Sequence, residues 1–374
     1  MNKERLLSLD VFRGLLVVCM LFVDNPGTWE TRFSIFNHAS WNGFTPPDFI
    51  FPSFVFAMGI AMAFSFGRKL EMQFDKVKIY KAIIIRTLSL FALGYIVNIC
   101  YHEGAYTFDS IRLLGVLQRF SIVYFIVSIC YLNISFKNLI IFGISIMLVY
   151  WGILTLIPVP GYGMPNLSLI PEKITPNIAA WIDLKLLGTK AWIYTQPYDP
   201  EGILSNSPSI STAIMGIAAG HWLKTKRSIE HKALGFFTIG FGFMLIGGIW
   251  NYWLPINKQL WSSSFVLFTG GLSMVIFASL YWIIDGLKKK SYLNDFFTYF
   301  GTNALLAFFL IDCVDAILSS IPAGTSSIKN LFFTSTLLNW LPEIHASWVY
   351  SCIVLGLYTI LFRFLYKRKI FLKL

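Results

Sequence analysis

The sequence has little charge and few of the side chains that usually carry catalysis. Only 13% of its 374 residues are Asp, Glu, Lys or Arg, and it contains five histidines and five cysteines. The cysteines stand singly in apolar stretches, with no Cys-x-x-Cys pair and no Cys/His ligand spacing, so a disulfide scaffold and a metal site are not expected. The scarcity of charge excludes an ordinary soluble domain.

Hydrophobic residues make up 56% of the chain, and apolar runs of about 20 residues recur from end to end. Each run is long enough to cross the ~30 Å hydrocarbon core of a bilayer. This pattern predicts an all-α polytopic membrane protein with one transmembrane domain over 1–374. The about ten expected transmembrane helices cover 11–25, 47–66, 80–100, 112–132, 138–157, 208–223, 233–254, 261–284, 296–318 and 346–366.

The basic residues predict the orientation of the chain. Of the 30 Lys and Arg, 20 lie in the termini and in loops on one side, seven lie on the other side, and Arg13, Arg86 and Arg119 fall within spans. Because basic loops stay in the cytoplasm, we expect both termini to be cytoplasmic. Insertion alone explains the net charge of +11, so no nucleic-acid partner is expected.

The longest segment outside the spans is 158–208, which is rich in Pro, Gly, Asn and Trp. A loop of this length is usually functional or disordered, and its many aromatic residues argue against disorder. We expect an ordered periplasmic loop that caps a cavity. A second outer segment, 321–345, is amphipathic in parts and is expected to lie along the membrane interface.

His38 is the strongest catalytic candidate, because it lies between the first two spans and an imidazole titrates near neutral pH. Asp24 and Asn25 end the first span, where Pro26 and the following glycine should break the helix. Asp48 begins the second span and can either cap it or orient the imidazole. An ordinary loop histidine is the alternative.

Two further pairs of charged residues are candidates for binding. Asp10 and Arg13 share one helix face, where they can form a simple ion pair or contact a ligand. Asp199 and Glu201 stand on a Pro/Gly-rich turn in the outer loop, where they could bind an ammonium group.

Eight short runs, in order along the chain, add a more specific signal. They are Leu9–Gly14, His38-Ala39-Ser40-Trp41-Asn42-Gly43, Phe51–Gly59, Gly115–Arg119, Pro158–Gly161, Tyr198–Leu204, Pro255–Ser262 and Tyr366–Phe371. In these runs the chain resembles the heparan-α-glucosaminide N-acetyltransferase family and its bacterial members.

The resemblance implies a transmembrane acyltransferase that moves an acetyl group from cytoplasmic acetyl-CoA to the amine of a glucosamine-type sugar or glycan end on the outer side. It implies that His38 is the essential residue. Asp24 or Asn25 would take the role of a family asparagine. It also implies a multi-pass protein of the bacterial inner membrane, and a homodimer is left open.

The expected roles divide into three groups. The catalytic set is His38, Asn25, Asn42, Asp24 and Asp48. His38 would be the general base or the acetyl carrier, an asparagine would donate to the oxyanion, and a carboxylate would orient the imidazole. The substrate-binding set is Asp10, Trp41, Asp199 and Glu201. The set expected to hold acetyl-CoA is Arg13, Arg119 and Gln118, with the two arginines on its phosphates.

A carrier is the competing hypothesis. A bundle of about ten spans with buried charges could also move an amino sugar or an N-acetyl sugar across the membrane without altering it.

Overall fold

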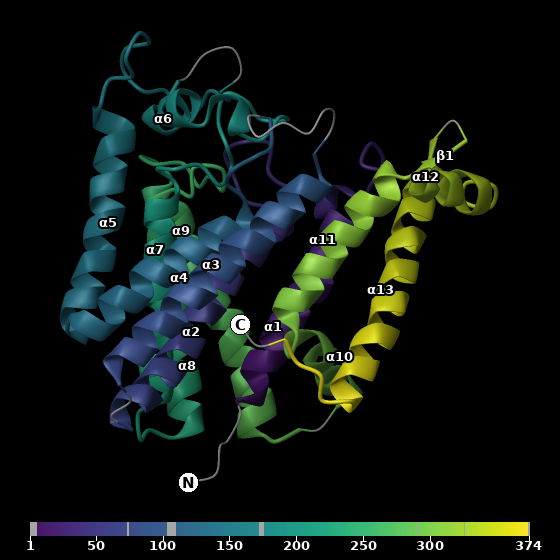
Figure 1. Ribbon diagram of the computed structural model, residues 1–374. Helices are drawn as coiled ribbons and strands as arrows, with labels where there is room; N and C mark the ends of the chain where they lie inside the picture. The colour runs from purple at the N-terminus through teal and green to yellow at the C-terminus, as the bar shows by residue number, and fades with distance from the viewer. Residues whose placement is uncertain are drawn as a thin grey trace. The chain divides into compact units, whose positions relative to one another are not determined.

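The computed structural model describes residues 6–72, 75–102, 110–171, 176–289, 291–324 and 326–372. Helices make up most of this part of the chain, which confirms the predicted all-α class (Figure 1). The described chain divides into two compact units. Unit 1 is Met1–His38, Thr45–Ile50 and Ser279–Leu374, and unit 2 is Ala39–Phe44 and Phe51–Ala278. The single domain predicted over 1–374 stays a prediction, because a unit of dense contacts need not fold alone.

Unit 2 holds the central helices of the chain. They are α2 (Ile50–Glu71), α3 (Lys76–Cys100), α4 (Val116–Asn133), α5 (Phe136–Leu156), α6 (Ile178–Leu186), the 3₁₀ turn η3 (Gly188–Lys190), α7 (Asn206–Leu223), α8 (Ile229–Trp250) and most of α9 (Ser263–Tyr281). Side-chain caps start several of them, since Asp75 accepts from the backbone of α3, Ser135 from that of α5 and Ser228 from that of α8.

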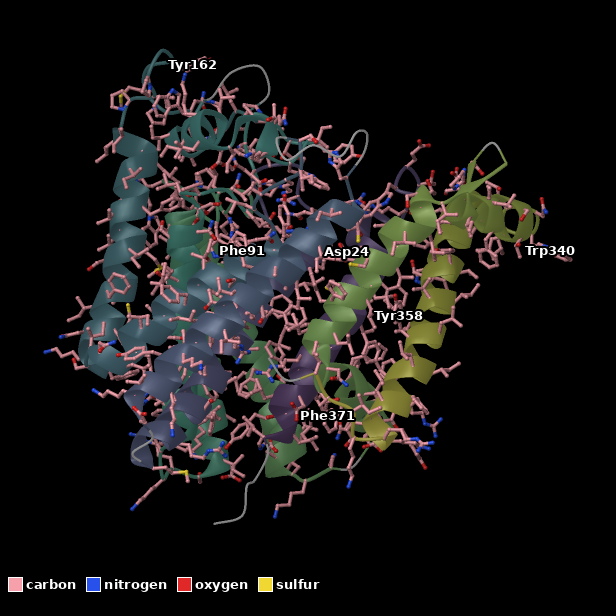
Figure 2. All side chains as sticks on the ribbon, in the orientation of Figure 1. Asp24, Phe91, Tyr162, Trp340, Tyr358 and Phe371 are labelled. Atoms are coloured by element: carbon pink, nitrogen blue, oxygen red, sulfur yellow. The ribbon has the colours of Figure 1, made fainter. Side chains whose placement is uncertain are left out.

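Unit 1 combines the beginning of the chain, Met1–His38, with its end, Ser279–Leu374. Its elements are α1 (Leu7–Asp24), η1 (Ser34–Phe36), η2 (Pro46–Phe49), the π turn η4 (Trp282–Gly286), α10 (Tyr292–Gly301), α11 (Ala304–Ser320), β1 (Pro322–Ala323), β2 (Ser326–Ser327), α12 (Ile328–Phe332), the π turn η5 (Phe333–Leu337) and α13 (Glu343–Lys367). The strands pair antiparallel, with Pro322 opposite Ser327. Tyr358 of α13 is directed at α11, where its hydroxyl donates to the Leu310 carbonyl (Figure 2).

Seven helical segments of the described chain are long and apolar enough to cross a membrane. They are Pro46–Arg68, Lys76–Cys100, Val116–Asn133, Phe136–Leu156, Ile229–Trp250, Ser263–Gly286 and Glu343–Lys367. Helices α10 and α11 qualify together as an eighth, but they are bent by 72° at the residues between them. The predicted span 296–318 therefore contains a break after Gly301, and its crossing of the membrane stays a prediction.

Two of the ten predicted spans, 11–25 and 208–223, correspond to α1 and α7, which are not among these segments. Three charged residues interrupt α1, and small and hydroxyl residues lower the hydropathy of α7. The count of ten and the cytoplasmic termini that follow from an even count thus remain predictions.

Close helix contacts hold α1 against α10 within unit 1. A Cβ at Gly14 would overlap the carbonyl of Phe297, and a Cβ at Gly301 would overlap the carbonyl of Asp10. Only glycine permits this approach of two backbones.

Segment 158–208 is folded in its described residues, 158–171 and 176–208, as predicted, and its periplasmic position stays a prediction. Figure 1 shows α6 beside one end of α5. Here Ile178, Ala179 and Tyr198 are buried with Tyr150 and Leu154 of α5. The polar cap Asn177 starts α6 by accepting from the backbone of Ala180. We call this end of unit 2 the α6 end.

Candidate functional site

His38 and Asp48 meet in unit 1. The Nδ1 atom of His38 lies 2.6 Å from Oδ1 of Asp48. The carboxylate is buried, at 1% exposure, whereas the imidazole is 34% exposed. A carboxylate can only accept, so Nδ1 carries the proton of this bond and Nε2 is the basic nitrogen of the neutral ring.

The other oxygen of Asp48 caps the turn that leads into α2. Its Oδ2 accepts from the backbone N–H of Thr45 at 3.0 Å and from the Thr45 hydroxyl at 2.8 Å. The Thr45 side chain and Asp48 together form a capping box around η2. The two alternatives raised for Asp48, capping and contact with the imidazole, therefore both occur, each on its own oxygen.

The segment that carries His38 folds back onto the end of α1. The ring of Phe36 stacks on that of Phe22 with centroids 5.9 Å apart, and Arg32 donates from Nη1 to the Val23 carbonyl. Helix α1 ends at Asp24, ahead of Asn25 and Pro26, which confirms the predicted break. His38 and the end of α1 consequently belong to the same end of unit 1.

Asn25 and Asp24 differ in what surrounds them. Asn25 is 3% exposed, and among the described residues its Nδ2 has no hydrogen-bond partner, although its own carbonyl accepts from Ser351. Burial lowers the pKa of the Arg32 guanidinium, and the nearby charge of Asp24 offsets part of that lowering. A buried amide donor without a partner is unusual and points to a role for Asn25 rather than Asp24.

Asp10 and Arg13 lie at the opposite end of α1. Asp10 precedes Asp24 by 14 positions, which is about 21 Å along a helix. Asp10 is buried in the first turn, and Ser8 beside it donates its backbone N–H to Asp285. Asp10 is thus far from the end of α1 that lies near His38, and its role in substrate binding stays a prediction. Arg13 is half-buried and remains a candidate for an anion at this end.

Asp199 and Glu201 are occupied by an arginine. Arg112 donates from Nε and Nη2 to the two oxygens of Asp199 at 2.8 and 2.5 Å, and from Nη2 to Glu201 at 2.5 Å. Both carboxylates are buried, at 1% and 7% exposure, and Asp199 also accepts from the backbone of Trp192. Arg112 neutralises both carboxylates in this structure, and their role in binding an ammonium group stays a prediction.

Arg119 belongs to the same network at the α6 end of unit 2. Its Nη2 donates to the Ser205 hydroxyl and the Pro200 carbonyl, and its guanidinium lies 4.8 Å from the ring centroid of Trp261. It is 1% exposed, and its Nε and Nη1 have no hydrogen-bond partner among the described residues. The predicted phosphate contact of Arg119 stays a prediction.

Gln118, its neighbour, is fully buried with neither amide atom paired among the described residues. A Cβ at Gly94 would overlap its Oε1, so the amide lies against the backbone of α3.

Trp41 and Asn42 fasten their segment to unit 2. The indole N–H of Trp41 and the Asn42 amide both donate to the Leu167 carbonyl, at 2.9 and 3.0 Å. Trp41 is 4% exposed and meets Tyr198 edge to face, while Asn42 accepts from Asn257. The Trp41 ring is buried and the Asn42 amide is hydrogen-bonded in this structure, and the substrate-binding role of Trp41 and the oxyanion role of Asn42 stay predictions.

Sequence reasoning missed Arg112 and Asp183. Asp183 accepts from the backbone N–H groups of Ile203 and Asp199, and burial raises its pKa to about 7 although these bonds lower it. A Cβ at Gly202 would overlap the Asp183 carboxylate. An acidic residue within the aromatic-rich segment 158–208 was the available signal.

Sequence reasoning also missed the carboxylates of α11. Asp312 is buried and interacts electrostatically with Asp24, and Asp315 forms a buried ion pair with Lys329 at 2.7 Å. Acidic residues inside an apolar run were a visible signal for this. Within the described residues, no group of three or more His, Cys, Asp or Glu could hold a metal ion.

Apolar helices of spanning length, together with polar residues buried among them, define a multi-pass membrane protein. Comparison with known proteins gives the family. The family described as "Heparan-alpha-glucosaminide N-acetyltransferase, catalytic" matches residues 5–247. The chain belongs to this family, as its sequence runs had indicated.

Two curated relatives carry the name heparan-alpha-glucosaminide N-acetyltransferase. The chain is 31% identical to the mouse protein over 357 residues, covering 82% of this chain and 53% of that protein. It is 30% identical to the human protein over 355 residues, covering 81% and 52%. The chain thus spans about half the length of the curated relatives it matches.

Proposed function

We propose that the protein is a transmembrane N-acetyltransferase. It would transfer an acetyl group from acetyl-CoA on the cytoplasmic side to the amine of a glucosamine-type sugar on the outer side of a bacterial inner membrane. The family and the names of the two relatives support the reaction class. The orientation rests on the distribution of basic residues.

The contact between His38 and Asp48 is the observation that carries the proposal. With the proton of Nδ1 directed at Asp48, Nε2 can take a proton from the ammonium form of the acceptor. The free amine then attacks the thioester carbonyl, the C–S bond breaks, and the imidazolium gives its proton to the departing thiolate. The new amide nitrogen loses its second ammonium proton to the again neutral Nε2, which releases it to solvent. The 34% exposure of the imidazole leaves it accessible for this step.

Asn25 is the proposed donor to the oxyanion that forms during the attack. Its Nδ2 is buried and without a partner in the described chain, so it is available to a transient negative charge. Arg13 at the other end of α1 is the proposed contact for the CoA phosphates. The contact of Gln118 with acetyl-CoA stays a prediction from the sequence.

The experiment that tests the proposal uses proteoliposomes with radiolabelled acetyl-CoA on one side and glucosamine on the other. Wild type should form labelled N-acetylglucosamine, and His38→Ala should lose about 10²- to 10⁴-fold in rate, as expected for a general base. The matched control is His345→Ala, another histidine of unit 1, which packs on Phe33 and should retain the rate.

Two other outcomes have distinct readings. If glucosamine crosses unmodified without acetyl-CoA and regardless of position 38, the protein is a carrier and the proposal fails. If label becomes bound to the protein when the acceptor is omitted, and His38→Ala abolishes it, the imidazole carries the acetyl group itself. Mass measurement of the purified protein in detergent tests whether it is a homodimer.

A further inference from the structure

Unit 2 contains an apolar groove that the proposed reaction does not use. It has a volume of about 740 Å³, within the range of ligand pockets, and its walls come from α5, α7, α8 and α9. Residues such as Ile140, Met147, Ile214, Ala218 and Phe243 line it. These helices include three of the membrane-spanning segments.

The groove is partly open, and most of its lining residues are apolar. Ile144, Leu148 and Ile239 of its rim are 48%, 50% and 44% exposed. The hydroxyl of Ser211 in its floor is already used, because it donates to the Gly143 carbonyl at 2.8 Å. In a membrane such a groove faces acyl chains, not water.

One end of the groove is basic. There Trp222 lines the wall, and Arg227 lies over its ring at 4.6 Å and donates to Nε2 of His231. The Trp222 indole donates to the Lys232 carbonyl, which holds the α7–α8 turn against the groove. The turn 224–232 contains four Lys or Arg and one Glu.

We propose that this groove binds one anionic phospholipid. An acyl chain would lie along the apolar walls, and the phosphate would meet Arg227 and the neighbouring bases of the α7–α8 turn. Basic residues next to a groove between transmembrane helices are the arrangement that anionic headgroups recognise. The predicted cytoplasmic position of the turn agrees with a lipid of the inner leaflet.

Two other occupants fit the groove less well. The pantetheine arm of acetyl-CoA carries two amides that would lie unpaired against these apolar walls. A second copy of the chain is disfavoured by shape, because a two-fold interface sets the same surface against itself, and two facing grooves would leave a void.

The test measures phospholipid bound to the purified full chain by native mass spectrometry. The delipidated protein is titrated with phosphatidylglycerol and, separately, with phosphatidylcholine of the same acyl chains. Ala218→Phe fills the groove, and Ala82→Phe on the exposed face of α3 is its control. Arg227→Gln removes the charge, and Lys78→Gln on α3 is its control.

We expect one phosphatidylglycerol per chain, weaker binding of phosphatidylcholine, and wild-type behaviour of both controls. Arg227→Gln should weaken phosphatidylglycerol about fivefold, the value of one basic residue near a headgroup. Ala218→Phe should weaken both lipids at least about tenfold, the effect of losing ~1.4 kcal/mol of chain contacts. Size-exclusion elution and circular dichroism establish that each variant is folded.

Equal binding of the two lipids, or unchanged binding in Arg227→Gln and Ala218→Phe, would overturn the proposal. A change from dimer to monomer in Ala218→Phe would instead identify a second copy as the occupant and also overturn it. If Ala218→Phe does not fold, the headgroup comparison and Arg227→Gln still decide. None of these measurements depends on acetyl transfer.

Discussion

Replacement of Asp48 by asparagine separates the two contacts that this carboxylate makes. In Asp48→Asn the amide keeps the size of the side chain but removes the negative charge opposite Nδ1 of His38. It also places an N–H₂ group where one oxygen accepts from His38 or Thr45. The imidazole then loses the partner that fixes its orientation and tautomer.

The expected loss follows from the strength of that bond. A hydrogen bond to a charged group contributes about 1.5–3 kcal/mol, which corresponds to a decrease of about 10- to 150-fold in kcat. KM for the sugar and for acetyl-CoA should change less than about twofold, because a positioning residue acts on the transition state more than on substrate binding. The assay is the initial rate of labelled product in proteoliposomes.

Thr45→Ala is the control for the capping role. It removes the hydroxyl that donates to Oδ2 at 2.8 Å and leaves the contact of His38 with Oδ1. Loss of a cap costs about 0.5–2 kcal/mol of stability, so the unfolding midpoint should fall while kcat stays within about twofold of wild type.

The reasoning is refuted if Thr45→Ala and Asp48→Asn lower kcat equally at temperatures where both are folded. Asp48 would then serve only to cap η2, and the short distance to His38 would have no catalytic meaning. Wild-type kcat in Asp48→Asn would refute it as well.

Three predictions concern the buried network of unit 2, and thermal unfolding in detergent checks all of them. Arg112→Gln should destabilise by about 3–5 kcal/mol, because it leaves Asp199 and Glu201 buried without their cation; an unchanged midpoint would contradict this. Gly202→Ala should unfold at lower temperature because its Cβ overlaps Asp183, and restoration by Asp183→Ala would identify that overlap as the cause. Burial raises the pKa of Asp183 to about 7, so between about pH 4 and 7 the folded protein keeps a proton that the unfolded chain has lost. The free energy of unfolding should therefore fall as pH rises through this range, by at most about 1.4 kcal/mol per pH unit. Asp183→Asn should remove that slope.

The contact of His38 with Asp48 could be anticipated because both residues lie in one short loop. They are ten positions apart, and Thr45 with Asp48 has the spacing of a capping box. The end of α1 was also predictable, since a proline follows Asn25 directly and cannot continue the hydrogen-bonding pattern. These features depend on local sequence.

The roles assigned to Asp199 and Glu201 could not be derived in the same way. Their partner Arg112 is 87 and 89 positions away, and nothing in the turn itself shows that it is buried. A Pro/Gly-rich turn with two acids is typical of an exposed loop, whereas long-range packing buries this one. The break after Gly301, in contrast, has a local signal in the sequence, because a Gly followed closely by an Asn favours the end of a helix.

The run from His38 to Gly43 combines two separate tasks. His38 belongs to unit 1 and contacts Asp48, whereas Trp41 and Asn42 belong to unit 2 and donate to one of its carbonyls. Gly43, with φ of 116°, donates its N–H to the Ile256 carbonyl, a backbone conformation that favours glycine. The residues after the histidine therefore hold the chain in unit 2, and their replacement should impair folding before it impairs chemistry. Within this run, only the imidazole has both the exposure and the partner that proton transfer requires.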